Sequence, residues 1–397
     1  NTGGGNFLMK KKSGGLVRKI NFADAVIVFI LLLFTCLALY PFIYTVAGSF
    51  NDGIDFEYGG IWFFPRKFTL ANYQAKSNQV GLCVINNLYS SKLLSELDSN
   101  IQLFLINRKK ASRNILDVFQ LNWNIFKFHP DILHIHDSDA ILYIPIRHLY
   151  YTILTIHATD LPLKGYKLYN KTVAISKAVA DNTEKRGLCK PEVIYNGILT
   201  SEIRQIKKKP LDNKQNFRIV QVGRLEHNIK GQHLLLEALH QLSVSHITID
   251  FIGDGSSYNY LKEVTRRFGL EEQVNFLGNC DVEWIYCHLC DYHLLVQPSL
   301  SEGFGLTVTE GMTAGTPVLV SDLPALLELT NTHGYYFKHN DVDALAQMLH
   351  HIIDHYEEAL LLADKARQYV TANFDSNSIV KQYISLYNEC IHKKHIK

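Results

Sequence analysis

The feature that most constrains this chain is a strict alternation of short apolar runs with amphipathic segments, which begins near Gln79. Short apolar runs bounded by polar or turn residues predict buried strands, and the segments between them have the spacing of helices. In the first block we expect strands at 80–85, 101–106, 132–136, 152–157 and 172–176. Alternation of this kind indicates parallel sheets that are covered by helices on both faces.

The alternation stops once and then starts again. Asn196-Gly197 and the polar stretch Lys207–Asn216 separate the first block from a second one, with strands expected at 217–223, 247–253, 274–278, 292–299 and 317–322. Two such blocks predict two doubly wound α/β domains, whose ligands bind at the carboxyl ends of the strands. We therefore expect the ligand site in the cleft between the two domains.

Length and composition agree with this plan. At about 150 residues per domain, 397 residues predict two or three domains. A hydrophobic share of 47% and a charged share of 20% exclude wholesale disorder, collagen and coiled coil. We expect a basic flexible N-terminus (1–20), a transmembrane helix (21–50), a linker (51–76), an N-terminal α/β domain (77–198), a C-terminal α/β domain (199–378), and a C-terminal helix that packs back on the body (379–397).

The charge balance and the cysteines exclude two further classes. The chain has 40 Lys+Arg and 38 Asp+Glu, for a net charge of +2, which is too balanced for a nucleic-acid-binding protein that works through a basic field. Its seven cysteines are odd in number and widely spaced, so they do not form a disulfide framework. We expect a reduced body that faces the cytosol.

One segment near the N-terminus has a different character. Ala25–Phe50 contains no charged residue, and about 20 apolar residues suffice to cross a bilayer. A secretory signal peptide is the alternative, but its apolar region is shorter, about 7–15 residues. Because basic residues precede the run and acidic residues follow it, the positive-inside bias places the N-terminus in the cytoplasm and residue 51 onward on the far side.

The sharpest motif runs from Ser299 to Asp322. It places Glu302 in a Gly-rich loop and Glu310, eight residues later, inside the helix that this loop opens. Carboxylates accept pairs of hydroxyl hydrogen bonds, which suits sugars, and the N–H groups at a helix start suit a phosphate. Gly303 and Gly305 allow the backbone to approach a ligand closely.

This string resembles the donor-site signature of the retaining glycosyltransferases of family 4. Further pieces follow in that family's order: IHDS at 135–138, TIHATD at 155–160, AISKAV at 174–179, IYNGI at 194–198, VGRLEHNIKG at 222–231, FIGDG at 251–255 and VNFLG at 274–278. The likeness covers about residues 79–387 and is stronger in the second half. It implies the α/β GT-B architecture, in which two Rossmann-like doubly wound domains face a cleft.

The resemblance also implies roles for single residues. Glu302 would hold hydroxyl groups of the transferred hexose, and Glu310 would hold the ribose hydroxyls. Arg224 and Lys230 would neutralise the diphosphate and stabilise the leaving group, and His157 would face the sugar from the first domain. The remaining donor-binding positions are Gly303, Phe304, Gly305, Leu306, Thr307, Gly223 and Gly253, of which Gly303 and Phe304 would present backbone groups.

The implied reaction keeps the anomeric configuration by a front-face route, so that neither glutamate need be a nucleophile. The co-substrate would be a nucleotide-diphosphate sugar, of the UDP type in the first instance, with no metal or other cofactor required. The acceptor would be a glycan or a lipid-linked sugar in surface polysaccharide biosynthesis. A small acceptor such as a sugar phosphate is the alternative.

The N-terminal region carries a second resemblance. LYPFIYTVAGSF followed by FFPRKFTLANY, within Met9–Tyr73, resembles the opening of the inner-membrane permease subunits of carbohydrate ABC importers. Nucleotide sugars are made in the cytoplasm, whereas the predicted orientation of the span places Glu302 and Glu310 outside. We therefore expect a chimera that is associated with the inner membrane through residues 25–50, with a body evolved for the cytoplasm. The alternative is a permease-derived membrane protein with an inactive or sugar-binding body.

Other polar groups have structural alternatives. His136 and Asp137 either reach the ligand or merely end a strand and cap a helix. Cys287-His288-Leu289-Cys290 has metal-ligand residue types, but no second Cys-x-x-Cys pair exists and the segment has helical spacing, so we predict no metal. The basic cluster Arg108–Arg113 is expected in a solvated loop, with docking on an anionic membrane as the alternative. The short first domain lacks the usual glycine pair after its first strand, which leaves acceptor binding the least defined part.

Overall fold

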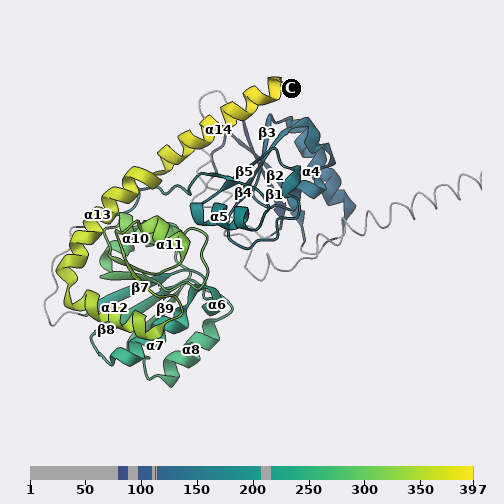
Figure 1. Cartoon of the computed structure of the whole chain (residues 1–397). Helices are drawn as coiled ribbons and strands as arrows, with labels where there is room; N and C mark the ends of the chain where they lie inside the picture. The colour runs from purple at the N-terminus through teal and green to yellow at the C-terminus, as the bar shows by residue number, and fades with distance from the viewer. Residues whose placement is uncertain (1–78, 88–96, 110–111, 113, 207–215, 397) are drawn as a thin grey trace, which may run out of the picture. The chain divides into compact units, whose positions relative to one another are not determined.

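The structure is a computed structural model, and it describes residues 79–87, 97–109, 112, 114–206 and 216–396 (Figure 1). The predicted basic N-terminus (1–20), transmembrane helix (21–50) and linker (51–76), and with them the permease-like stretch, lie outside the described residues. The chain divides after Asp52 into two units, and the second unit, Gly53–Lys397, contains every residue described here. In that described part, no helix combines the length and the apolar character that a membrane span requires.

The second half contains a parallel sheet of six strands in the order β12-β11-β10-β7-β8-β9. This is the strand order of a doubly wound fold, in which the chain returns from β9 to form β10 beside β7. The strands are β7 (Phe217–Val222), β8 (Ile247–Ile252), β9 (Val274–Gly278), β10 (Leu294–Gln297), β11 (Val318–Ser321) and β12 (Tyr335–Phe337). The switch point between β7 and β10 is where such sheets bind ligands.

Alternate residues of these strands enter two different cores. Leu294 and Val296 of β10 lie in one buried cluster, whereas Leu295 between them lies in another. Side chains of a strand point to opposite faces in turn, so a sheet covered on both sides requires apolar residues at every position. The helices of this half are α6 (His227–Lys230), α7 (Gln232–Leu242), α8 (Tyr258–Arg267), α9 (Val282–His288), η6 (Leu289–Asp291), α10 (Leu306–Thr313), α11 (Pro324–Thr330) and α12 (Val342–Asp354) (Figure 1).

The described strands of the first half are all parallel, as the alternation predicts, and they fall into two sheets. In its described residues, β1 (Val80–Asn86) pairs in parallel with β2 (Ile101–Arg108), while β3 (Ile132–Ile135), β4 (Tyr151–Ile156), β5 (Lys171–Ala174) and β6 (Glu192–Val193) form a separate parallel sheet. The strands that would join the two sheets are weakly packed, since neither β1 nor β3 has a fully buried residue. The helices are α4 (Ile115–Phe128), η3 (Ala140–Tyr143), η4 (Pro145–Leu149), η5 (Tyr166–Leu168) and α5 (Lys177–Lys185).

The last two helices are α13 (Tyr356–Phe374) and α14 (Ser376–Ile396), the yellow end of the chain in Figure 1. Four residues of α14 at spacings of three and four, Ile379, Tyr383, Leu386 and Cys390, form one buried cluster with Ile153, Val173 and Ile194 of the first half. The entry into α14 is held by Asp375, whose carboxylate accepts a 2.6 Å hydrogen bond from the Thr200 hydroxyl. The end of the chain thus completes the core of the first half.

Candidate functional site

Three loops of the predicted site follow directly on the carboxyl ends of neighbouring strands. Gly223 follows β7, Gly253 follows β8, and the loop with Glu302 follows β10. At Gly253, with φ +132°, an added Cβ would lie only 2.1 Å from the carbonyl oxygen of Gly223. The two strand ends therefore touch backbone to backbone, which only glycine allows.

The structure brings Lys230 and Glu302 into direct contact. The Lys230 Nζ donates a 2.7 Å hydrogen bond to Glu302 Oε2, and the two side chains are 18% and 13% exposed. The Ser299 hydroxyl donates to the same carboxylate oxygen at 3.2 Å. Because the pair is largely shielded from solvent, its attraction exceeds that of an ordinary surface ion pair.

The turn after Lys230 explains how this pair is positioned. Gly231 has φ +66°, and an added Cβ would lie 1.9 Å from the carbonyl oxygen of Pro298. The amide of Leu300 donates a 2.8 Å hydrogen bond to the carbonyl of Ile229. Backbone contacts therefore hold the end of α6 against the loop after β10, in addition to the Lys230–Glu302 ion pair.

Arg224 adds a second cation to the same place. Its side chain is half-buried, and its carbonyl accepts a 2.7 Å hydrogen bond from Gln232 Nε2. Burial lowers the pKa of Arg224, while the nearby carboxylates of Glu226 and Glu302 raise it in part. An arginine remains charged at any ordinary pH, so Glu302 lies in the field of two cations.

The helix after this loop starts at Gly305, with φ +104°, where an added Cβ would meet Leu326 Cδ2 at 2.7 Å. Leu306 is the first helical residue, and the Thr307 hydroxyl donates to Gln297 Oε1 at 3.4 Å. Glu310 is buried within the helix, at 2% exposed. Glu310 therefore has little accessible surface in this structure.

Phe304 has a structural role in addition to its predicted one. Its side chain is buried, and its ring lies 6.2 Å from that of Tyr195 and 5.7 Å from that of Phe374. Only the backbone of Phe304 is thus left for a ligand.

The loop that carries Glu302 also contacts the first half. An added Cβ at Gly303 would lie 2.4 Å from the carbonyl oxygen of His157, and the Ser176 hydroxyl donates a 2.7 Å hydrogen bond to the Gly303 carbonyl. Nearby, the Glu328 carboxylate accepts from the amides of Lys177 and Ala178, at 2.7 and 2.9 Å, and so caps α5. The sequence offers no local signal for this cap, because its two partners are about 150 residues apart.

His157 belongs to an array of three histidines at the carboxyl ends of β3 and β4. His136 Nδ1 lies 2.8 Å from His157 Nε2, and the His136 ring stacks on that of His134 with centroids 4.7 Å apart. His134 in turn is within 2.6 Å of the hydroxyls of Tyr387, on α14, and Thr155. The array therefore links the C-terminal helix to the residue that contacts Gly303.

Burial decides the protonation of this array. It lowers the pKa of His136 to about 4, and it lowers the pKa of His134 and His157 well below 6.5, with a further contribution from the neighbouring histidines. All three rings are thus neutral at pH 7. In the His136–His157 hydrogen bond one neutral ring donates and the other accepts.

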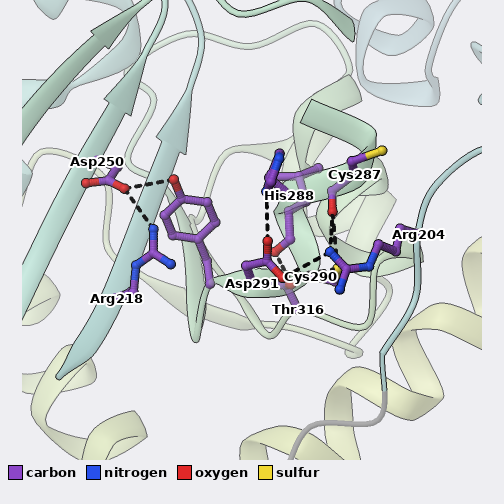
Figure 2. Close-up of polar contacts among 10 residues, drawn as sticks. Arg204, Arg218, Asp250, Cys287, His288, Cys290, Asp291 and Thr316 are labelled. Carbon is purple, nitrogen blue, oxygen red and sulfur yellow. Dashed lines mark hydrogen bonds and ion pairs between the residues drawn. The ribbon is translucent and has the colours of Figure 1, made fainter. Parts of the chain in front are cut away.

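The cysteine-containing segment 287–290 is bound within a network of structural contacts (Figure 2). Arg204 donates to the Cys287 carbonyl at 3.2 Å, and His288 Nδ1 lies 2.8 Å from Asp291 Oδ2. Figure 2 also shows Asp250, whose carboxylate is approached by Arg218. Within the described ranges, no group of three or more His, Cys, Asp or Glu side chains has the arrangement of a metal site.

Two family models match adjoining parts of the chain. Residues 69–202 match the model described as Glycosyltransferase Family 4, and residues 202–369 match the model described as Glycosyl transferases group 1. The junction at residue 202 falls after the last strand of the first half, β6, and before the first strand of the second half, β7.

Curated relatives match over part of their length. The chain is 29% identical over 205 residues to a glycogen synthase of Mycobacterium tuberculosis, which covers 51% of this chain and 49% of the relative. It is 27% identical over 226 residues to the O-antigen biosynthesis glycosyltransferase WclY of Escherichia coli, which covers 55% of this chain and 62% of the relative. The chain thus spans about half of the first relative and somewhat more of the second.

Solved structures share the fold. A glycosyltransferase from Rickettsia africae aligns with a TM-score of 0.67 at 20% identity, covering 82% of this chain and 94% of that chain. HepE of Anabaena, in complex with UDP and glucose, aligns with a TM-score of 0.66 at 19% identity, covering 81% and 94%. Together with the parallel sheets of the two halves described above, these alignments assign the GT-B fold.

Proposed function

We propose that this chain, a glycosyltransferase by both of its domains, moves a hexose from a nucleotide-diphosphate sugar to a glycan or lipid-linked acceptor. The observation that carries the proposal is the shielded Lys230–Glu302 pair beside Arg224, at the carboxyl ends of β7 and β10. It combines cations for a diphosphate with a carboxylate for sugar hydroxyls at one place.

The pair suggests how the donor engages the site. A diphosphate competes with Glu302 for Lys230, and transfer of Lys230 to the phosphate leaves the Glu302 carboxylate to accept hydrogen bonds from the hexose. Arg224 adds its charge to the leaving group as the bond between C1 and the phosphate oxygen breaks. Such preorganised cations stabilise the charge that develops in the transition state.

The reaction we propose is a retaining transfer without a metal. The acceptor hydroxyl attacks C1 on the face that the diphosphate leaves, and its proton passes to the leaving phosphate oxygen. Glu302 and Glu310 act as hydrogen-bond acceptors for hexose and ribose and form no bond to carbon. The anomeric configuration of the product, determined by NMR, tests retention, and activity in the presence of a chelator tests the absence of a metal.

The proposed donor nucleotide and the proposed biosynthetic role rest on the chain's similarity to other glycosyltransferases. HepE has been crystallised with UDP and with UDP-glucose, which supports a UDP sugar as donor. WclY, by its name, acts in O-antigen biosynthesis, which supports a role in surface polysaccharide assembly. We further propose that residues 25–50 attach the chain to the inner membrane, with the body in the cytoplasm.

A thermal-shift panel on the full chain tests the donor site. UDP, GDP, ADP, CMP and their common sugar conjugates are added, and a ligand at 100 times its Kd stabilises the fold by about 2.7 kcal/mol. We expect stabilisation by one nucleotide and its sugar. Glu310→Gln, which keeps the size of the side chain and removes its charge, should lose most of it.

Glu271→Gln is the matched control, since Glu271 is an exposed glutamate of the same half. It should leave the nucleotide effect unchanged. A folded chain that no nucleotide stabilises would contradict the proposed activity and favour an inactive or sugar-binding body.

A further inference from the structure

Helix α4 exposes an apolar stripe on the first half of the molecule. Ile115, Leu116, Phe119, Trp123 and Phe126 are each between 55% and 68% exposed. Ile115 and Leu116 are adjacent, and the later residues follow at spacings of three and four, which places all five on one face of a helix of 14 residues, about 21 Å long. The opposite face, with Leu121 and Ile125, is buried. The helix therefore has two apolar faces. One of them packs into the first half, and the other is exposed to solvent.

The aromatic residues of the stripe lie against one another. The rings of Phe119 and Trp123 stack with centroids 6.4 Å apart and planes 11° from parallel, and Trp123 lies 6.1 Å from Phe126. Scattered exposed apolar residues are normal in proteins, whereas a contiguous exposed patch marks an interaction surface. Aromatic side chains are also the ones that favour the boundary between water and lipid.

The charges around the stripe are those that suit an anionic surface. Lys127 is exposed in the last turn of α4, and Lys109 is exposed just before the helix. Arg108, which we expected in a solvated loop, is the last residue of β2 and is buried, so it is not one of these surface charges. The only acidic residue of α4, Asp117, is half-buried, and its carboxylate accepts hydrogen bonds from Asn114 and Ser112, at 2.7 and 3.4 Å.

The sequence connects this helix to an uncharged segment. Ala25–Phe50 contains no charged residue, and residues 51–79 separate it from β1, the strand on which α4 packs together with β2. We propose that the stripe Ile115–Phe126 of α4 inserts into the interface of a membrane that contains anionic lipids. Insertion buries the aromatic rings at the level of the headgroups, while Lys109 and Lys127 contact lipid phosphates.

Fluorescence of Trp123 in the full chain tests the insertion. The chain has three tryptophans, so Trp62→Phe and Trp284→Phe leave Trp123 as the reporter. Vesicles of phosphatidylcholine with phosphatidylglycerol, prepared with brominated acyl chains, should shift its emission to the blue and quench it. Vesicles of phosphatidylcholine alone should quench it less. Because the readout is the depth of Trp123, it is independent of glycosyl transfer.

Substitutions on the stripe have a matched control elsewhere. Phe119→Ser with Phe126→Ser should abolish most of the quenching, whereas Tyr336→Ser with Leu361→Ser, at exposed positions of the second half (58% and 67%), should leave it unchanged. Lys109→Gln and Lys127→Gln should each weaken the interaction about fivefold, since a basic residue at an anionic surface contributes about 1 kcal/mol.

Three results would overturn the proposal. The first is a Trp123 that brominated vesicles of either composition leave unquenched. The second is a Trp123 that is already shielded from iodide before vesicles are added and becomes accessible on dilution, because this indicates a second copy of the chain on α4. The third is shielding that persists on dilution and is lost when Ala25–Phe50 is deleted, because this indicates that the chain's own apolar segment covers the stripe.

Discussion

The two halves of the molecule hold their predicted site residues in different ways. In the second half, Gly253 touches Gly223, and Gly231 touches Pro298, through backbone atoms alone. In the first half, His157 is held by the side chain of His136, which stacks on His134 and reaches α14 through Tyr387. The donor loops thus depend on glycines at close approaches, whereas the opposing side depends on the packing of buried rings.

The sheets show the same contrast. Every position of β10 and β11 is buried, and six strands form one layer. The described strands of the first half form two smaller sheets, and the four-stranded one needs α14 to complete its core. The first half, whose core includes residues of α14, is therefore expected to unfold more readily than the second half, which has one continuous sheet.

The largest expected effect is on the backbone contacts of the second half. Gly253→Ala forces a Cβ against the Gly223 carbonyl and strains a residue with positive φ, so we expect a loss of about 3–5 kcal/mol in urea unfolding. Gly269→Ala is the control, since Gly269 also has positive φ but no atom within 4 Å of an added Cβ. Gly269→Ala should lower the free energy of unfolding by about 1 kcal/mol. Equal losses would show that φ, not the contact, determines the effect.

Removal of a cation from the donor loops is expected to affect turnover. Lys230→Ala should lower kcat about 100- to 1000-fold, because preorganised charge on a leaving group is worth that much, and should change the donor KM less. Steady-state kinetics with the donor identified by thermal shift provide the measurement. Lys338→Ala, at an exposed lysine of the same half, should have no effect. Equal losses in kcat and donor affinity would contradict the role on the leaving group.

Low pH is expected to destabilise the first half of the molecule. The pKa of His136 is lowered to about 4 in the folded chain and returns to about 6.5 on unfolding, so the unfolded state binds more protons between these values. Stability is complete above pH 6.5 and falls as the pH approaches 4, by about 3 kcal/mol from His136. Urea unfolding across this range should show a shallower pH dependence for His136→Gln. His350→Gln, at an exposed histidine, should keep the original slope.

The smallest effect is expected at the junction of α14 with the histidine array. Tyr387→Phe removes the hydroxyl that lies 2.6 Å from His134 Nδ1 and should cost about 1 kcal/mol. Hydrogen exchange should locate the loss in β3 and β4. Tyr336→Phe, at an exposed tyrosine, should leave the free energy of unfolding unchanged. A loss of protection that falls outside β3 and β4 would contradict the role of the Tyr387 hydroxyl.

The periodicity of the sequence was sufficient to predict most strands of the molecule. Buried parallel strands require apolar residues at successive positions, and this requirement is visible in β7, β8 and β10 without any structure. The division of the described strands of the first half into two sheets was not predicted, because strand pairing depends on neighbours that a local pattern does not contain.

The sequence by itself determined the βα order, the break between the halves, and the presence of Arg224 and Glu302 in loops that follow strands, with Lys230 shortly after the first of these loops. Only the tertiary structure decided that Lys230 pairs with Glu302, that Glu328 caps α5, and that Tyr387 reaches His134. The physical reason is how far apart in the sequence the contacting residues lie. Strand and helix periods arise between neighbouring residues, whereas these contacts join side chains 72 to 253 residues apart and exist only once both halves have folded.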